Sequence, residues 1–327
     1  MGTAGRAGPT TFREMIPFRR GPHEIAENTW AYLQPDGGWG WSNAGLVTDG
    51  TASLLIDTLF DLPLTATMLA ELRAVAPAAA EIGTLVNTHA NGDHCYGNQL
   101  VAGAEIVASR ASAREMDEVP SSLLAALLRA APDLGVTGAY LTDIFGSFVF
   151  DGIEITPPTT TFDGSLTLRV GDRVVELYEL GPAHTQGDVI VHIPDRQVVY
   201  TGDLVFHGGH PIAWAGPIAG WMAACDRILA LDPAIVVPGH GPLSDRQCVV
   251  DQRGYFEWLV AEGTPRLQAG MAPLDAAFDL AGGPYAGWGE GERLVVNLIA
   301  LARDLGQNPP DDLLVVLGAM AALAARP

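Results

Sequence analysis

The sequence contains no lysine, because all 18 basic residues among its 327 are arginines. Without lysine, the chain can use neither a Schiff base on a lysine amine nor a Walker A phosphate loop, which needs its Gly-Lys pair. Acidic residues outnumber basic ones and give a formal net charge of −20. A surface of that sign repels phosphate backbones, so we expect no nucleic-acid partner.

Cysteine is scarce as well, with three residues and no CxxC pair. A sparse, odd set argues against a disulfide framework and fits a reducing compartment. The first residues lack the apolar segment of a secretion signal. The longest apolar run without charge, at 313–325, is too short to span a bilayer. We therefore expect a cytoplasmic protein with no membrane partner.

Hydrophobic residues make up 48% of the chain, enough to bury a sizeable core. We expect strands at 29–33, 45–48, 53–57, 82–87, 105–108, 165–170, 174–180, 189–193, 198–201 and 235–237. We expect helices at 64–75, 109–117, 121–131 and 218–230, and again from Ser244 to the end. This alternation predicts an α/β or layered α+β fold. No long linker is visible, so we divide the chain into a flexible tail (1–12), a main domain (13–245) and a helical extension packed on it (246–327).

A polar turn follows the expected strand at 82–87, and residues 88–94 read Thr-His-Ala-Asn-Gly-Asp-His. Further ligand-type residues follow later strands and small residues. Loops at one sheet edge can bring such side chains to one centre. Histidine nitrogen and aspartate oxygen suit zinc, iron or manganese, and the lack of a cysteine cluster argues against a structural zinc ribbon. The expected metal ligands are His89, Asp93, His94, His184, Asp203 and His240.

This ordered set resembles the metallo-β-lactamase-fold hydrolases, whose signature is His-x-His-x-Asp-His followed by distant His, Asp and His. The resemblance covers about residues 25–245, including 43–47 and 54–58, which are similar to the family's opening strands. It implies an αββα sandwich with one or two metal ions at one edge, here with extra C-terminal helices. It assigns one ion, expected to be zinc, to His89, His184 and a bridging Asp203, and a second to Asp93, His94, His240 and the same Asp203.

Asn91 departs from that signature, because it stands where the second histidine belongs. An amide oxygen is a weaker zinc ligand than an imidazole, so we predict loose binding in the half of the site formed by His89 and His184. We predict tight binding in the half that contains Asp93 and His240. Asn91 is then a weak ligand or a pocket residue; the alternative is a turn residue that hydrogen-bonds its own loop.

The chemistry that the resemblance implies is hydrolysis through metal-bound hydroxide, since a divalent ion lowers the pKa of its water towards about 7. Asp93 is the expected catalytic residue, orienting the water or transferring its proton. The same ion can act as a Lewis acid that stabilises an enolate, which is carbon–carbon bond chemistry.

Tryptophans near the expected site have two interpretations. Trp39 and Trp41 lie on a glycine-rich stretch between early strands, where they suit a lid over a large apolar substrate or pack against the sandwich edge. Trp214 and Trp221 flank the Asp203 loop and carry the same two interpretations.

Histidines and a cysteine near the motifs also need roles. His207 and His210 follow Asp203 closely and either line the pocket or lie on a surface loop. We expect His23 and His192 to be structural. Cys95 follows the motif directly, and we expect a small buried residue rather than a nucleophile.

Within the superfamily, residues 89–94 followed by Gly-Asn-Gln-Leu at 97–100 are similar to the second- and third-ring cyclases, or cyclase-thioesterases, of bacterial aromatic polyketide pathways. That similarity implies a poly-β-ketone substrate, free or bound to an acyl carrier protein, that is cyclised or released. Because carrier proteins are usually acidic, docking would need a basic patch, for which Arg13, Arg19 and Arg20 are the candidates.

Three alternatives stay open. The first is a general thioesterase or lactonase that acts on a small metabolite. The second is an iron-bearing redox protein, which this superfamily also contains, and the third is a metal-bound binding protein without catalysis. The helices after Ser244 form either a homodimer surface or a lid over the pocket.

The substitution at Asn91 generates a prediction about metal content. After purification and dialysis, elemental analysis should find fewer than about two ions per chain, because one half of the site lacks an imidazole. Two tightly held ions would contradict the predicted asymmetry.

Overall fold

The computed structural model describes residues 16–101, 103–116 and 118–326. The tail expected at 1–12, and Arg13 of the expected basic patch, lie outside the described residues.

A seven-stranded sheet forms the first half of the fold. Its first four strands are antiparallel, and β4 to β7 run parallel to one another. In spatial order the strands are β1 (Gly21–Ala26), β2 (Thr29–Leu33), β3 (Ala44–Asp49), β4 (Ala52–Ile56), β5 (Thr84–Val86), β6 (Glu105–Ser109) and β7 (Thr160–Phe162).

A second sheet of five strands packs against the first. Here β11 and β12 are parallel, whereas the other neighbours are antiparallel. Its spatial order is β12 (Ile235–Val237), β11 (Val198–Tyr200), β10 (Val189–Ile193), β9 (Arg173–Glu179) and β8 (Ser165–Val170).

The core between the sheets explains why they face each other. Buried side chains alternate with partly exposed ones along β9, so that Val175 and Leu177 point inward. They join one apolar cluster with Leu54 and Ile56 of β4 and Val191 of β10. Facing apolar surfaces of this kind hold two sheets together through the hydrophobic effect.

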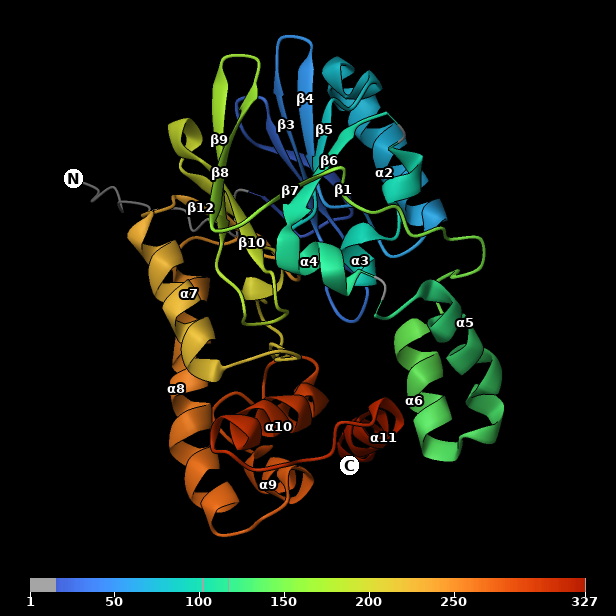
Figure 1. Cartoon of the computed structure of the whole chain (residues 1–327), viewed down its shortest axis with the longest axis vertical. Helices are drawn as coiled ribbons and strands as arrows, with labels where there is room; N and C mark the ends of the chain where they lie inside the picture. Colours follow the sequence, from blue (N-terminus) through green and yellow to red (C-terminus); the bar gives the residue numbers. More distant parts are fainter. Residues whose placement is uncertain (1–15, 102, 117, 327) are drawn as a thin grey trace, which may run out of the picture.

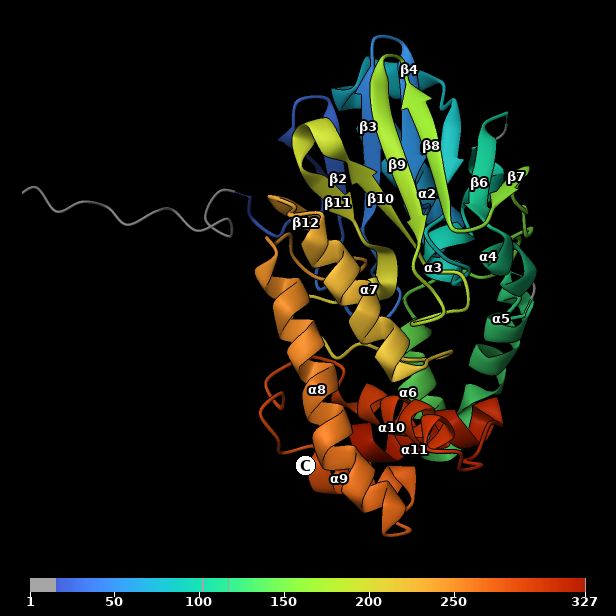
Figure 2. The same ribbon diagram turned by 60° about the vertical axis from the view of Figure 1, so that its left-hand side comes forward.

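Helices cover the outer face of each sheet, which gives the expected αββα order of layers (Figures 1 and 2). The helix α2 (Leu62–Val75) packs Met68 and Leu72 against Leu55 of β4. Asp61 caps its first turn by accepting a hydrogen bond from the Leu64 backbone N–H at 2.8 Å. On the other face, α7 (Ile218–Ala230) and α8 (Gln247–Gln268) bury side chains in one core with β10 and β11.

The remaining long helices gather at one end of the sandwich (Figure 1). They are α5 (Ser121–Ala130), α6 (Gly135–Phe145), α9 (Pro273–Leu280), α10 (Leu294–Asp304) and α11 (Leu313–Ala324). Two short helices, α3 (Gly92–Cys95) and α4 (Arg110–Glu115), lie at the sheet edge that faces them. The apolar run at 313–325 forms α11, which buries Val316, Leu317 and Met320. None of the helices in the described part of the chain is both long and apolar enough to cross a membrane.

Local pattern predicted most elements but missed several, three of which are β1, α6 and β7. The expected strands at 29–33, 165–170, 189–193 and 235–237 and the helix at 218–230 have the predicted bounds. The edge strand β1 was missed because Gly21, Pro22 and Glu24 weaken its strand signal. The helix α6 contains two glycines, and its packing against α11 overrides that low helix propensity. The third, β7, has only three residues.

Leu54 tests the core between the sheets. Its side chain is 0% exposed, so Leu54→Ala should lower the free energy of unfolding by about 2–5 kcal/mol, through lost burial and a residual cavity. Leu314, which is 47% exposed, is the matched control, and Leu314→Ala should change stability by no more than about 0.5 kcal/mol. Urea unfolding measures both variants. Equal losses in the free energy of unfolding would show that burial of Leu54 between the sheets does not stabilise the fold.

Candidate metal centre

The six expected ligands come from loops that follow strands, all at one edge of the sandwich. The segment after β5 carries three of them, with His89 on the turn and Asp93 and His94 within α3. The others follow β9, β11 and β12. Since the ends of these strands meet at one edge, residues distant in sequence become neighbours, and the structure brings together His89, Asp93, His94, His184, Asp203 and His240.

Asp203 lies at the centre of the group. Its Oδ1 is 3.0 Å from His94 Nε2, and its Oδ2 is 3.4 Å from His240 Nε2 and 3.5 Å from His184 Nε2. His89 Nε2 is slightly farther away, at 3.9 Å from Oδ2. All four imidazoles therefore direct the same nitrogen, Nε2, at one carboxylate.

The opposite nitrogen of two of these imidazoles donates to a backbone carbonyl. His184 Nδ1 donates to Ile212 O at 2.7 Å, and His240 Nδ1 shares its hydrogen between Gly37 O and Gly38 O, both at 3.1 Å. Because a carbonyl oxygen only accepts, Nδ1 carries the hydrogen and Nε2 presents a lone pair. This arrangement is typical of metal-binding histidines.

Asp57 performs the same task for the other two imidazoles. It accepts a hydrogen bond from His94 Nδ1 at 2.9 Å and one from Thr88 Oγ1 at 2.7 Å, which leaves the Thr88 oxygen to accept from His89 Nδ1 at 3.0 Å. In the sequence alone, Asp57 is only the end of an expected strand. Its signal was an aspartate directly after an apolar strand, and the backbone there has φ 60, a strained value for a residue with a side chain.

The unsatisfied atoms fit a divalent cation. His89 Nε2, His94 Nε2 and Asp203 Oδ1 are all buried, and none has a partner with hydrogen-bonding geometry. Once the imidazoles are neutral, their lone pairs cannot satisfy one another, whereas a cation accepts all of them at once. Two overlapping groups are close enough to share an ion: His89, His94 and Asp203, and Asp93, His94 and His240.

Asn91 makes the two halves of the site unequal. Its Nδ2 amide donates to His184 Nε2 at 3.0 Å, and so occupies the lone pair that His184 would offer to an ion. Asp93 Oδ2 and His240 Nε2, 3.2 Å apart in the other half, have no such competitor. The geometry thus gives a physical reason for the asymmetry predicted from the sequence.

The four histidines also differ in the direction in which their pKa values are shifted. Burial acts to lower the pKa of His94, but the charges of Asp203, Asp93 and Asp57 together outweigh it and raise that pKa well above its usual range. The same balance raises the pKa of His240 to about 9. Burial lowers the pKa of both His89 and His184. A metal ion must therefore displace protons from His94 and His240, and its binding weakens as the pH falls.

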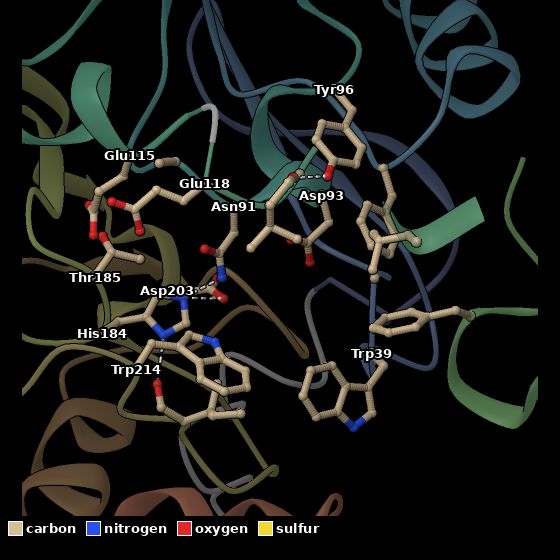
Figure 3. Close-up of a pocket in the computed structure, with 18 of the residues that line it drawn as sticks. Trp39, Asn91, Asp93, Tyr96, Glu115, Glu118, His184, Thr185, Asp203 and Trp214 are labelled. Atoms are coloured by element: carbon tan, nitrogen blue, oxygen red, sulfur yellow. Dashed lines mark hydrogen bonds and ion pairs between the residues drawn. The ribbon is translucent and has the colours of Figure 1, made fainter. Parts of the chain in front are cut away.

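The centre forms the floor of a cavity of about 270 Å³. Figure 3 shows Trp39 on one side of the ligands and Trp214 on another, both at the cavity. Most of the remaining wall is apolar. Its aromatic members are Trp39, Phe60, Tyr96, Phe145, Phe206 and Trp214, and its aliphatic members include Leu124, Leu127, Leu313 and Leu317.

Three expected pocket residues lie elsewhere among the described residues. Trp41 does not line this cavity, because it packs on Phe148 at 4.8 Å, with Arg20 over its ring. His210 is buried between Tyr255 and Trp288. His207 donates from Nδ1 to Pro242 O and lines a neighbouring cavity instead. The backbone conformation of the glycine-rich loops decides where these three side chains point, and the sequence alone does not reveal that conformation.

Trp39 is fixed rather than free to act as a flexible lid. Its Nε1 donates to Glu292 Oε1 at 2.8 Å, and its ring meets Phe145 edge-on at 5.9 Å. Trp221 is a core residue, fully buried, with Nε1 donating to Leu204 O at 2.9 Å.

The structural roles expected for other residues match their positions. Cys95 is buried, and burial raises the pKa of its thiol, which disfavours the nucleophilic thiolate. His192 donates to Glu176 at 2.9 Å, and His23 contacts Arg19 O at 2.8 Å, both outside the cavity.

Two carboxylates that the sequence analysis missed form a polar wall of the cavity. Glu115 and Glu118 lie beside Thr185, on the Asn91 side of the site (Figure 3). Burial raises the pKa of Glu115 to about 7. Both residues lie just after or within α4, which carries no motif that would have marked them.

A family model described as the metallo-beta-lactamase superfamily matches residues 37–240. Among curated proteins, the acyl-coenzyme A thioesterase MBLAC2 of Homo sapiens is 28% identical over 94 residues, which are 27% of this chain and 33% of that protein. A linear primary-alkylsulfatase of Pseudomonas sp. (strain ATCC 19151) is 25% identical over 222 residues, 60% of this chain and 41% of that protein. The aligned part thus spans less than half the length of these two relatives.

Two solved structures show the same fold. The sec-alkylsulfatase Pisa1 from Pseudomonas sp. matches with a TM-score of 0.66 at 16% identity, over 87% of this chain and 50% of that one. A metallo-beta-lactamase from Pontibacter korlensis matches with a TM-score of 0.56 at 20% identity, over 73% of this chain and 99% of that one. Identities this low establish the fold and not the substrate.

Asn91 offers a direct test of the asymmetry. Asn91→His removes the donor that occupies His184 Nε2 and supplies a further imidazole, so the metal content at saturation should rise towards about two ions per chain. Calorimetric zinc titration measures this. Asn91→Ala is the control, because it removes the donor without adding a ligand. Unchanged stoichiometry in Asn91→His would refute the role given to Asn91.

Proposed function

The chain belongs to the metallo-beta-lactamase superfamily, and from this membership we propose that it is a metal-dependent hydrolase of esters or thioesters with a large apolar acyl group. The observation that carries the proposal is the position of the six-residue centre, at the floor of a cavity with aromatic walls.

The residues at the centre divide the work. His94, His240 and Asp203 hold the ion together with Asp93, and a divalent ion held there supplies Lewis acidity, which lowers the pKa of water and polarises a carbonyl group. Zinc is the ion we propose, and iron and manganese suit the same donors.

Asp93 is the proposed catalytic residue. It is 9% exposed and reaches the cavity, and its Oδ2 is held 3.2 Å from His240 Nε2. At that position, the carboxylate orients a water molecule and takes up its proton at an oxygen atom.

The walls select the substrate. Phe60, Tyr96 and Phe145 pack edge-on or stacked against one another and leave an apolar surface next to the ligands. Such a surface binds an acyl chain or an aromatic ring by the hydrophobic effect and excludes water from the reacting bond.

Negative charges near the cavity restrict which leaving groups the enzyme can accept. Glu115 and Glu118 lie at the cavity, and the whole chain carries a net charge of −20. These charges repel the phosphates of a coenzyme A thioester, although a relative is named an acyl-coenzyme A thioesterase. We therefore favour a leaving group without phosphate near the cavity mouth.

A narrower proposal is a cyclase-thioesterase of aromatic polyketide formation. The aromatic cavity has the character that a poly-β-ketone chain requires, and the centre can stabilise an enolate as well as serve hydrolysis. Ring formation from a poly-β-ketone thioester, detected as a new aromatic product, is the result that supports this narrower role.

A second candidate is alkyl sulfate hydrolysis. The alignment with the linear primary-alkylsulfatase covers 60% of this chain, more than the thioesterase alignment covers. Alkyl sulfates therefore belong in the same assay series, and cleavage of these alone would favour this candidate.

Chelation and one substitution test the proposed hydrolase. Turnover of an aryl-acyl thioester should disappear on chelation and return with zinc. Asp93→Ala should lower kcat by about 100-fold or more, because it removes the group that handles the proton. The matched control is Asp311→Ala, an exposed aspartate outside the cavity, which should keep full activity. Hydrolysis that survives complete metal removal would refute the proposal.

A further inference from the structure

Arg293 places a positive charge in the wall of the cavity. It ends the 3₁₀ turn Gly291–Arg293, immediately before α10, and lines the same cavity as Asp203 and His240. Its side chain is only 1% exposed. It also lies beyond residue 240, where the match to the family model ends. The C-terminal helices therefore contribute a buried cation that the family signature does not include.

Most hydrogen-bond donors of this guanidinium are unused. An arginine has five N–H donors, and among the described residues only Nη1 makes a hydrogen bond, to His210 O at 3.0 Å. Nε is buried without a partner, and Nη2 has none either. Among the described residues, no carboxylate oxygen lies within 4.0 Å of an Arg293 nitrogen, which is the limit for an ion pair. A buried cation with unpaired donors costs free energy. The site is therefore incomplete without an acceptor, which a bound ligand can supply.

A second buried arginine, Arg173, has a carboxylate as its partner. Arg173 is 8% exposed and does not line the cavity. Its Nη1 donates to Glu27 O at 3.1 Å and to Thr29 Oγ1 at 3.0 Å, and its Nε lies 3.9 Å from Asp195 Oδ2. Arg173 also leaves Nε without a hydrogen-bond partner, but a carboxylate lies within ion-pair distance of it, whereas Arg293 has no such carboxylate among the described residues.

The guanidinium lies over two aromatic rings. Its Cζ lies 4.4 Å from the ring centroid of Trp39 and 5.1 Å from that of Phe206. Phe206 in turn stacks on His240, with centroids 5.2 Å apart and an angle of 9° between the planes. Because Nη1 is occupied and Nε is fully buried, the donor that remains for a ligand is Nη2, one ring away from a metal ligand.

Two carboxylates set the local charge without pairing to the arginine. Glu292 Oε1 accepts from Trp39 Nε1 at 2.8 Å and from Tyr140 Oη at 3.1 Å. Burial raises the pKa of Glu290, and the charge of Arg293 opposes that rise. Because these residues offset part of the cationic charge, the missing acceptor need not be a full anion. A ketone oxygen suits this donor as well as a carboxylate.

We propose that Arg293 is a substrate-binding residue, which donates from Nη2 to a second oxygen of the acyl group, several bonds from the cleaved ester. The substrate class is therefore an acyl ester or thioester whose apolar chain also carries a keto or carboxylate oxygen. The inference rests on the proposed function, because it takes the substrate to be an acyl ester.

Three thioesters of similar length test it: the N-acetylcysteamine thioesters of hexanoate, 5-oxohexanoate and glutarate. With the wild-type holoenzyme, kcat/KM should be about 10- to 100-fold higher for a thioester with the second oxygen than for hexanoate, the usual effect of a hydrogen bond to a charged group. Whether the keto or the carboxylate compound benefits identifies the oxygen. Arg293→Gln should abolish the preference, because kcat/KM should fall about 10- to 100-fold further for the oxygenated thioester than for hexanoate.

The matched control is Arg303→Gln, the same change at an exposed position on α10, which should keep the preference. An equal loss for all three thioesters in Arg293→Gln would show a purely structural role and overturn the proposal. A wild-type enzyme that prefers hexanoate would overturn it too. Should Arg293→Gln fail to fold, Arg293→Lys keeps the charge and should retain part of the preference.

Binding separates this inference from the proposed function. Calorimetry with the unreactive amides of the same three acids measures recognition without turnover. If the oxygenated amides bind more tightly to wild type than to Arg293→Gln while no thioester is cleaved, Arg293 keeps its role and the hydrolase proposal fails. If the thioesters are cleaved but neither turnover nor binding depends on Arg293, the hydrolase stands and this inference fails.

Discussion

The convergence of four imidazole Nε2 atoms on the buried carboxylate of Asp203 is the constraint on which the rest of the structure depends. These nitrogens lie 3.0–3.9 Å from its oxygens, and hydrogen bonds behind the rings commit each Nδ1 to donating. Lone pairs arranged in this way repel one another unless a cation lies among them. The sandwich satisfies the requirement because β5, β9, β11 and β12 all end at one edge, so that a rigid scaffold presents each ligand.

Around that centre, single residues adjust what the shared architecture offers. Asn91 turns a symmetric set of donors into an unequal one, because its amide hydrogen-bonds to the Nε2 of His184. Asp57 works from behind the site and orients His94 directly and His89 through Thr88. Neither residue changes the fold. Both determine how many lone pairs remain available for an ion and in which direction they point.

Part of the cavity wall lies farther from the centre, in parts of the chain that the family model does not cover. Leu313 and Leu317 of α11 and Arg293 before α10 complete a cavity whose other walls come from the sandwich. These helices share one apolar core with the five-stranded sheet, which holds Arg293 in place over Trp39 and Phe206. The sandwich thus supplies the candidate metal centre, and the C-terminal part of the chain supplies three residues of the cavity wall above it.

The sequence by itself determined the expected ligands and most strands, because local patterns mark both. Each expected ligand follows an apolar strand, and alternating or continuous apolar residues mark the strands. It also marked Asn91 as a departure. Only the tertiary structure decided that Asp57, Glu115 and Arg293 belong to the site, and that Trp41, His207 and His210 do not line its cavity. Those assignments depend on strand register and helix packing between residues far apart in the chain, which no local pattern records.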